Sequence, residues 1–287
     1  MTQQPLMVTY YNNNTLPLTS LTSTQYTDVI LAFAVPENDQ STTLVLSGNL
    51  PSTSDLQSDI QTLQQAGIMV HLSFGGAVGL DGQPINYTLL SQNVSDVANQ
   101  LAAFVTTYNL DGIDIDYEDT NALLDGTPYD GVAFASDLTN DLRQAIGTDK
   151  IISHAPQPPY LWQDATSFPY AEILTNTDGA INRIYMQYYN NPSYVTPVSL
   201  IIDNYNAIVA GWTGFSGLAA SQLLVGKPVA ESDAGSGWIP ATDIGEQIIN
   251  PLLAAYSDFG GVMGWQYSSD GPNGPWSTAL PAYLWPS

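Results

Sequence analysis

Cysteine is absent from this chain of 287 residues, and histidine occurs only twice, as His71 and His154. The lack of cysteine excludes a disulfide, a thiolate metal site and a cysteine nucleophile. With only two histidines, there are few candidate ligands for an imidazole zinc site and few candidates for the histidine of a Ser-His-Asp triad. We expect both rings to pack in the core. The composition therefore indicates neither a metal centre nor thiol chemistry.

Positive charge is almost as scarce, with 4 lysines and arginines against 27 aspartates and glutamates and a net charge of −23. Such a surface repels nucleic-acid backbones and anionic membranes, so we expect neither as a partner. Charged residues total 11%, below the ~25% of an average soluble domain, and serine, threonine, asparagine and glutamine take their place. No stretch approaches the ~18 consecutive apolar residues of a membrane helix.

The chain is long enough for one large unit, and its hydrophobic residues, 44% of the total, suffice for a core. Barrels of alternating strands and helices fill ~250 residues, so we expect one domain over residues 1–287. Residues 1–6 contain neither the basic nor the apolar segment of a signal peptide. Because the charge balance favours a secreted protein of acidic surroundings, we expect an extracellular location, with the signal peptide not present in this chain.

Apolar, β-branched runs alternate with segments of helical periodicity along the whole chain. The expected helices are Asp55–Ala66, 94–108, 134–146 and Val198–Gly211, and Pro251 should interrupt or restart a further one. The expected strands are Met7–Tyr11, Tyr26–Val35, Ile68–Phe74, 110–118, Lys150–Pro156, Ile181–Tyr189, Gln222–Ala230 and Gly261–Tyr267. This alternation predicts the α/β class, a single-domain (β/α)8 TIM barrel with its site at the carboxyl ends of the strands.

The fourth expected strand, 110–118, reads L-D-G-I-D-I-D-Y-E. Side chains alternate faces along a strand, so Asp114, Asp116 and Glu118 share one face, ~6.6 Å apart per step. The isoleucines and Tyr117 share the other face. The acids either face water on an antiparallel strand or crowd inside a barrel, where burial raises a carboxyl pKa. A calcium site is disfavoured, because a straight strand lacks the loop that wraps the ion.

The same stretch fills every fixed position of the D-G-x-D-x-D-x-E signature and resembles the family 18 glycoside hydrolases, the chitinases and their relatives. Further stretches resemble the single-domain, plant-type (class III, hevamine-like) branch and follow in the same order over almost the whole chain. These stretches are Ser73–Gly76, His154–Gln157, Met186–Pro192, Glu231–Pro240 and Gly261–Trp265.

Two departures from the family pattern affect the expected cleft. The disulfides common in the plant branch cannot form, and the α+β insertion that deepens many bacterial clefts has no room before the last strand. We therefore expect an open groove that favours internal cleavage of a polymer. The resemblance also implies non-proline cis peptide bonds at Ala32-Phe33 and Trp265-Gln266.

The resemblance implies a substrate-assisted, retaining mechanism, in which the N-acetyl oxygen of the sugar attacks the anomeric carbon. Glu118 would be the general acid and base, and Asp116 would orient the acetamido N–H. Asp114 would either tune Asp116 or serve a structural role, and Tyr189 would donate its hydroxyl to the acetamido oxygen. No metal or cofactor is implied, since the substrate supplies the nucleophile.

Substrate contacts are also implied at the strand ends. Trp265 would form an apolar floor under the sugar at the cleaved bond, because pyranose C–H faces pack on indole rings. Gln187 would bind a substrate hydroxyl or Asp116. The remaining candidates for the groove are Tyr10, Phe33, Gly75, Gln157 and Trp238.

Three functions fit these expectations. The first is an endochitinase acting on chitin or chitooligosaccharides, polymers of β-1,4-linked N-acetylglucosamine, as a monomer. The second is an endo-β-N-acetylglucosaminidase that cuts the cores of N-glycans. The third is a non-catalytic, carbohydrate-binding relative, which is disfavoured because the acid at Glu118 is intact.

The charge balance predicts an unusual response of stability to pH. Protonation of the carboxylates at low pH leaves only the 4 lysines and arginines and the 2 histidines charged, so self-repulsion weakens on acidification. We expect the melting temperature to hold or rise between pH 7 and pH 4 in a calorimetric series. A steady fall over that range would contradict adaptation to acidic surroundings.

Overall fold

Eight parallel strands form a closed barrel in the computed structural model, which describes residues 4–286. The ring runs β1, β2, β4, β5, β6, β7, β8 and β9 and closes through the pairing of β9 with β1. Their bounds are β1 Leu6–Tyr11, β2 Asp28–Pro36, β4 Met69–Gly75, β5 Gly112–Asp116, β6 Ile151–His154, β7 Arg183–Gln187, β8 Leu223–Pro228 and β9 Gly261–Trp265. The predicted barrel is therefore confirmed, whereas the expectation about residues 1–6 lies partly outside the described residues.

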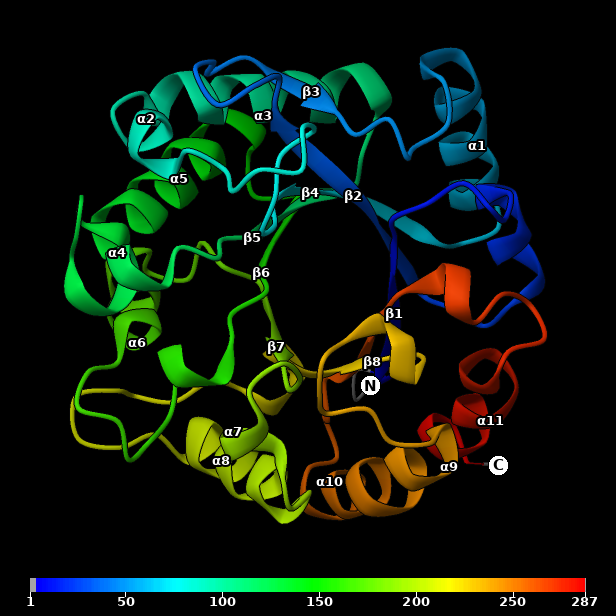
Figure 1. Cartoon of the computed structure of the whole chain (residues 1–287). Coiled ribbons are helices and arrows are strands. Elements are labelled where there is room, and N and C mark those ends of the chain that lie inside the picture. Colours follow the sequence, from blue (N-terminus) through cyan, green and yellow to red (C-terminus); the bar gives the residue numbers. More distant parts are fainter. Residues whose placement is uncertain (1–3, 287) are drawn as a thin grey trace.

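Helices surround the barrel on its outside, as Figure 1 shows in a view down its axis. Pro251 lies in the first turn of α10, but α10 continues without a gap from a π-helical stretch at Gly245–Ile249, so the expected break or fresh start is only a change of helix type. The helices are α1 Thr53–Gln65, α2 Tyr87–Ser91, α3 Val94–Tyr108, α4 Thr120–Asp125, α5 Gly131–Ile146, α6 Pro169–Asn176, α7 Pro192–Val195, α8 Ser199–Ala210, α9 Ala241–Ile244, α10 Asn250–Ala255 and α11 Pro275–Leu284. Within the described residues, no α+β domain interrupts the connection from β8 to β9.

An additional short strand, β3 (Leu44–Leu46), pairs antiparallel with the end of β2 through Ala34, Val35 and Pro36. Its three residues are too few for an alternating pattern, so the strand was not predicted within its turn-rich surroundings. β2 continues past its last pairing with β4, at Ala34, and β3 pairs with this end of β2. The two strands together form a wall at the carboxyl ends of the neighbouring strands.

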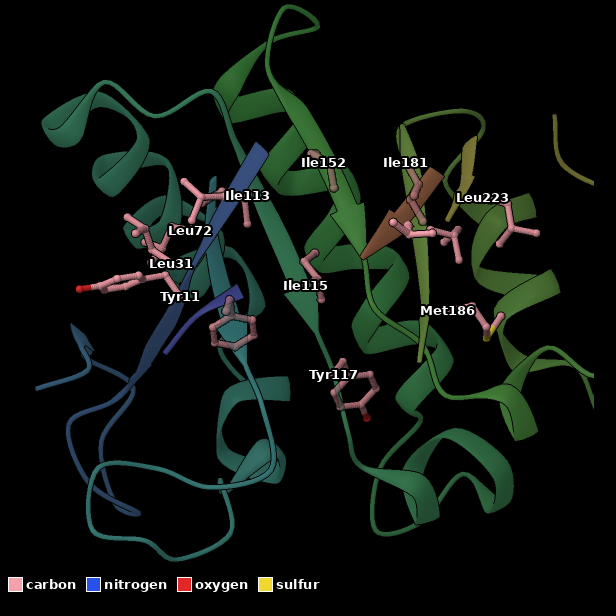
Figure 2. Close-up of a cluster of buried hydrophobic side chains, with 14 of the residues drawn as sticks. Tyr11, Leu31, Leu72, Ile113, Ile115, Tyr117, Ile152, Ile181, Met186 and Leu223 are labelled. Carbon is pink, nitrogen blue, oxygen red and sulfur yellow. The ribbon is translucent and has the colours of Figure 1, made fainter. Parts of the chain in front are cut away.

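Two apolar clusters fill the molecule. The larger cluster lies between the strands and the helices, and Figure 2 shows part of it, with Ile113, Ile115 and Tyr117 following one another along the chain. The smaller cluster lies inside the barrel and includes Tyr10 and Met263. The alternation predicted for the acidic strand is thus confirmed, with the isoleucines toward the helices, although β5 ends at Asp116 rather than at residue 118.

The amino end of the barrel contains a buried ion pair. Arg183 Nη1 lies 2.6 Å from Asp28 Oδ1, and His71 Nε2 lies 3.0 Å from the same oxygen. Burial alone would raise the pKa of Asp28, but the hydrogen bond from His71 and the charge of Arg183 hold it below its ordinary value. His71 therefore does more than pack, whereas His154 is buried and hydrogen-bonds Thr139.

Removal of Arg183 tests this pair. We expect Arg183→Met to cost about 3–5 kcal/mol of unfolding free energy, because it leaves the Asp28 carboxylate buried without its cation. The double variant Asp28→Asn with Arg183→Met should be more stable than the single one, since it leaves no charge behind. Urea unfolding measures both, and a single variant within 1 kcal/mol of the parent would contradict the assignment.

Candidate active site

A cavity of about 510 Å³ opens at the carboxyl ends of the barrel strands. Its walls come from the segments directly after β1, β3, β4, β5 and β7 and from the last residues of β2 and β9. The lining residues are Asn12, Phe33, Val35, Ser47, Gly48, Asn49, Gly76, Ala77, Val78, Gly79, Leu80, Asp116, Glu118, Gln187, Tyr189, Asn190 and Trp265. Six of the residues expected from the sequence are brought together here: Asp116, Glu118, Gln187, Tyr189, Trp265 and Phe33.

Gln187 connects the acids to the neighbouring strand. Its Nε2 donates to Asp116 Oδ1 at 2.7 Å and to the Ala155 carbonyl at 2.9 Å, and it lies 3.5 Å from Glu118 Oε1. Of the two partners expected for Gln187, a substrate hydroxyl or Asp116, its amide contacts Asp116 in the structure. A buried acid held by an amide keeps a fixed orientation.

Both cavity acids hold their protons more tightly than an ordinary carboxyl group. Burial is the largest cause for Asp116, followed by the negative charges of Glu118 and Asp114, and together they raise its pKa well above the usual value. Burial also raises the pKa of Glu118, against hydrogen bonds with Gln187 and Asp116 that lower it. The crowding of acids predicted from the strand alternation thus has its expected electrostatic effect.

Asp114 lies below the cavity and does not line it. It is fully buried and accepts hydrogen bonds from the hydroxyls of Tyr10 at 2.7 Å, Ser73 at 2.7 Å and Ser153 at 2.8 Å. Ser153 was not among the residues expected from the sequence, and its role follows from the strand register. Ser73, Asp114 and Ser153 pair side by side on β4, β5 and β6 and so point the same way.

Two aromatic rings form the floor of the cavity, and a third lies beneath them. Phe33 and Trp265 stack with centroids 6.0 Å apart, and Tyr10 meets Trp265 edge-on at 5.4 Å. Tyr10 is only 1% exposed and lies beneath the other two, so it supports the floor rather than lining it. Cis peptide bonds occur at Ala32-Phe33 and Trp265-Gln266, as expected from the resemblance.

Tyr189 lines the cavity from a tight turn after β7. Its amide donates to the Gln187 carbonyl at 2.7 Å, and the next residue, Asn190, has a left-handed φ of 57°. The Asn190 side chain accepts from the Gly235 amide at 2.7 Å, which ties the turn to the loop after β8. Burial, followed by Asp116, Glu118 and Asp114, raises the pKa of Tyr189 well above its ordinary value, so its hydroxyl remains a donor.

The other three expected residues lie away from the cavity lining. Gly75 has a φ of 110°, and a Cβ there would stand 2.3 Å from the Asp116 carbonyl oxygen, so its contribution is close backbone packing. Gln157 Oε1 accepts from Asn191 Nδ2 at 3.1 Å. Trp238 is 37% exposed and donates to the Val229 carbonyl at 3.2 Å.

The turn after β3 and the loop after β4 form a wall of the cavity that was not expected from the sequence. Ser47, Gly48 and Asn49 line the cavity because β3 lifts them there, and that strand was not predicted. Val78 and Leu80 are 50% and 47% exposed on the loop after β4, where no motif marks them.

The described residues also bear on metal binding and on insertion into a membrane. In residues 4–286, no cluster of three or more His, Cys, Asp or Glu side chains is arranged to hold a metal ion. Within the same residues, none of the helices is long and apolar enough to cross a membrane.

Buried, proton-holding carboxyl groups beside an aromatic floor, at the carboxyl ends of a (β/α)8 barrel, define the class of glycoside hydrolases. The sequence profile described as glycosyl hydrolases family 18 matches residues 6–267. The chain belongs to this family.

Relatives and solved structures agree with that assignment. "Acidic endochitinase SE2" of Beta vulgaris is 33% identical over 259 residues, which cover 86% of this chain and 80% of the relative. The crystal structure of a GH18 chitinase from Pseudoalteromonas aurantia has a TM-score of 0.87 at 35% identity and covers 97% of this chain and 99% of its own. The xylanase-α-amylase inhibitor protein XAIP-I, solved in complex with trehalose, shares the fold with a TM-score of 0.68 at 21% identity, over 98% of each chain.

Substitution of Gly75 tests how closely the end of β4 packs against the Asp116 carbonyl of β5. We expect Gly75→Ala to cost more unfolding free energy than Gly82→Ala. Both glycines have positive φ, but only the Cβ at position 75 meets backbone, whereas nothing lies within 4 Å of that at position 82. The backbone penalty common to both is about 1–2 kcal/mol. Equal losses in urea unfolding would show that the Asp116 carbonyl moves without cost.

Proposed function

We propose that this protein is an endochitinase that hydrolyses β-1,4-linked N-acetylglucosamine polymers with retention of configuration through a cyclic oxazolinium intermediate. One observation carries the proposal. Within the described residues, the acids that line the cavity are Asp116 and Glu118, and both come from the end of β5. An ordinary retaining enzyme needs a carboxylate on the far side of the sugar, ~5 Å from the acid, so here the acetamido group of the substrate must supply the nucleophile.

Glu118 is suited to the role of general acid and base. Its raised pKa keeps the proton available in weakly acidic solution, where an exposed glutamate has already lost it. The carboxyl donates this proton to the leaving oxygen as the glycosidic bond breaks. The resulting carboxylate then takes a proton from the water that opens the intermediate.

Asp116 and Tyr189 are suited to hold the acetamido group. Asp116 accepts from its N–H, which orients the carbonyl oxygen toward the anomeric carbon and stabilises the positive charge that develops. Tyr189 donates its hydroxyl to the same carbonyl oxygen, a role that its raised pKa supports. Asp114 stays out of contact with the sugar and raises the pKa of Asp116 through its charge.

The shape of the site favours a polymer as the substrate. Trp265 and Phe33 provide an apolar surface for the faces of pyranose rings. The cavity extends past the turn after β3 toward Val78 and Leu80, farther than one sugar requires. We propose that the chain acts as a monomeric, extracellular enzyme with one catalytic domain over residues 1–287.

The relatives support chitin as the substrate. The Beta vulgaris relative is named an acidic endochitinase, and the Pseudoalteromonas aurantia protein is described as a chitinase. The resemblance to the inhibitor protein XAIP-I extends to the fold alone at 21% identity. The intact Glu118 at the cavity favours the catalytic function over a binding one.

Turnover of a chitin hexasaccharide by the parent and by Glu118→Gln tests the proposal. We expect the parent to release β-anomeric products, detected by NMR in the first minutes. Turnover by Glu118→Gln should fall by several orders of magnitude, because loss of a general acid lowers the rate by ~10²–10⁴ or more. The control is Glu172→Gln, an exposed glutamate on α6, which should keep full activity.

Other outcomes point to other functions. Binding of the hexasaccharide without cleavage by the parent would indicate a lectin. Absence of binding, together with cleavage of an N-glycan core, would indicate an endo-β-N-acetylglucosaminidase. Initial release of α-anomer would contradict the retaining mechanism.

A further inference from the structure

Lys227 on β8 is a buried cation that the proposed mechanism does not use. It is 1% exposed, and its Nζ donates to the backbone carbonyl of Tyr188 at 3.0 Å. Side-chain alternation puts it, with Val225, on the face of β8 toward the helices. Within the described residues, the salt bridges involve Asp28 and not Lys227. Burying an ammonium group without a carboxylate is costly, so its single strong contact calls for an explanation.

The hydrogen-bond ladder between β7 and β8 provides that explanation. Gln187 pairs with Gly226, and the Tyr188 amide donates to the Gly226 carbonyl at 3.1 Å. In a parallel ladder, the next bond would run from the amide of residue 228 to the Tyr188 carbonyl. Residue 228 is proline, which has no N–H. The Lys227 ammonium supplies the donor that the backbone lacks.

The peptide bond held in this way is the one that leads into Tyr189. The chain leaves the ladder there and turns at Asn190, while Gly237 packs against Tyr189 Cα from the loop after β8. Contacts to the loop after β8 hold the far side of the turn, and Lys227 holds its near side. A shift of the Tyr188 carbonyl would therefore rotate the peptide that carries the Tyr189 ring.

We propose that Lys227 is a positioning residue that, through the Tyr188 carbonyl, sets the Tyr189 hydroxyl for contact with the substrate acetamido group. This inference rests on the proposed function, because it assigns Tyr189 to that contact. Burial lowers the pKa of Lys227 to about 8, so below that pH the side chain is an ammonium group and a strong donor. Methionine has a similar length and no donor, which makes it the informative replacement.

The test is a double-mutant cycle at pH 6 on a chitin hexasaccharide, with the parent, Lys227→Met, Tyr189→Phe and the double variant. We expect Lys227→Met to lower kcat by about 10- to 100-fold, as misplacement of a contact group does, with a smaller change in KM. In the Tyr189→Phe background the same substitution should change kcat less than about twofold, because the hydroxyl is already gone. A merely structural lysine would cause the same loss in both backgrounds.

Lys150→Met is the matched control, because Lys150 Nζ also donates to a backbone carbonyl, that of Leu110, at 2.8 Å. Leu110 precedes β5 and so lies at the opposite end of the barrel from the cavity. This variant should keep the parent kcat.

Rescue gives a second, independent readout. Pro228→Ala restores a backbone N–H, so Lys227→Met with Pro228→Ala should recover most of the kcat lost by Lys227→Met. If Lys227→Met alone does not fold, this double variant decides the question: active protein supports the proposal, and folded but inactive protein overturns it.

A kcat of Lys227→Met equal to that of the parent would also overturn the inference. So would an equal fall in kcat with Tyr189 and with Tyr189→Phe, and either result leaves the proposed function intact. The proposed function fails separately, if the parent does not cleave the hexasaccharide.

Discussion

The structure of the site depends on a row of acids enclosed by a parallel barrel. Because side chains alternate on β5, the isoleucines that anchor the strand to the helices force Asp114 and Asp116 into the interior. Asp114 is tolerated there only because three hydroxyls donate to it. Above it, incomplete solvation raises the proton affinity of both Asp116 and Glu118, and the like charges of Glu118 and Asp114 raise that of Asp116 further. The packing of the strand thus generates the acid that the chemistry needs.

The four lysine and arginine side chains of the chain all bond to groups within the fold. Arg183 neutralises Asp28, Lys227 donates to Tyr188, and Lys150 and Arg143 donate to backbone carbonyls near the amino end of the barrel. Lys227, Lys150 and Arg143 thus donate to backbone carbonyls, whereas Arg183 compensates a buried carboxylate. The surface is left with acids and neutral polar groups, which explains how a net charge of −23 coexists with a well-bonded core.

Sequence patterns predicted the barrel, its strand order and the cavity residues that belong to strand ends, because period-two alternation and the signature motif act locally. Prediction failed where tertiary context decides. The strand β3 is three residues long and forms only because β2 extends past the rim. Ser153 contributes through register, which a single strand does not reveal. Gln157 and Trp238 follow strand ends as expected, but they do not line the cavity and instead hydrogen-bond Asn191 and the Val229 carbonyl.

In the proposed function, residues at the strand ends carry out the chemistry, whereas the loops between strands and helices would select the polymer. An inhibitor protein shares this fold at 21% identity, so the barrel alone does not determine the activity. The strand ends hold Asp116, Gln187 and Trp265 through contacts that the barrel itself fixes. The turn after β3 lines the cavity with Ser47 and Asn49, and the loop after β4 lines it with the exposed side chains of Val78 and Leu80. Under the proposed function, changes in those two segments would alter which polymer is bound, while the groups proposed to hold and move the proton would stay in place.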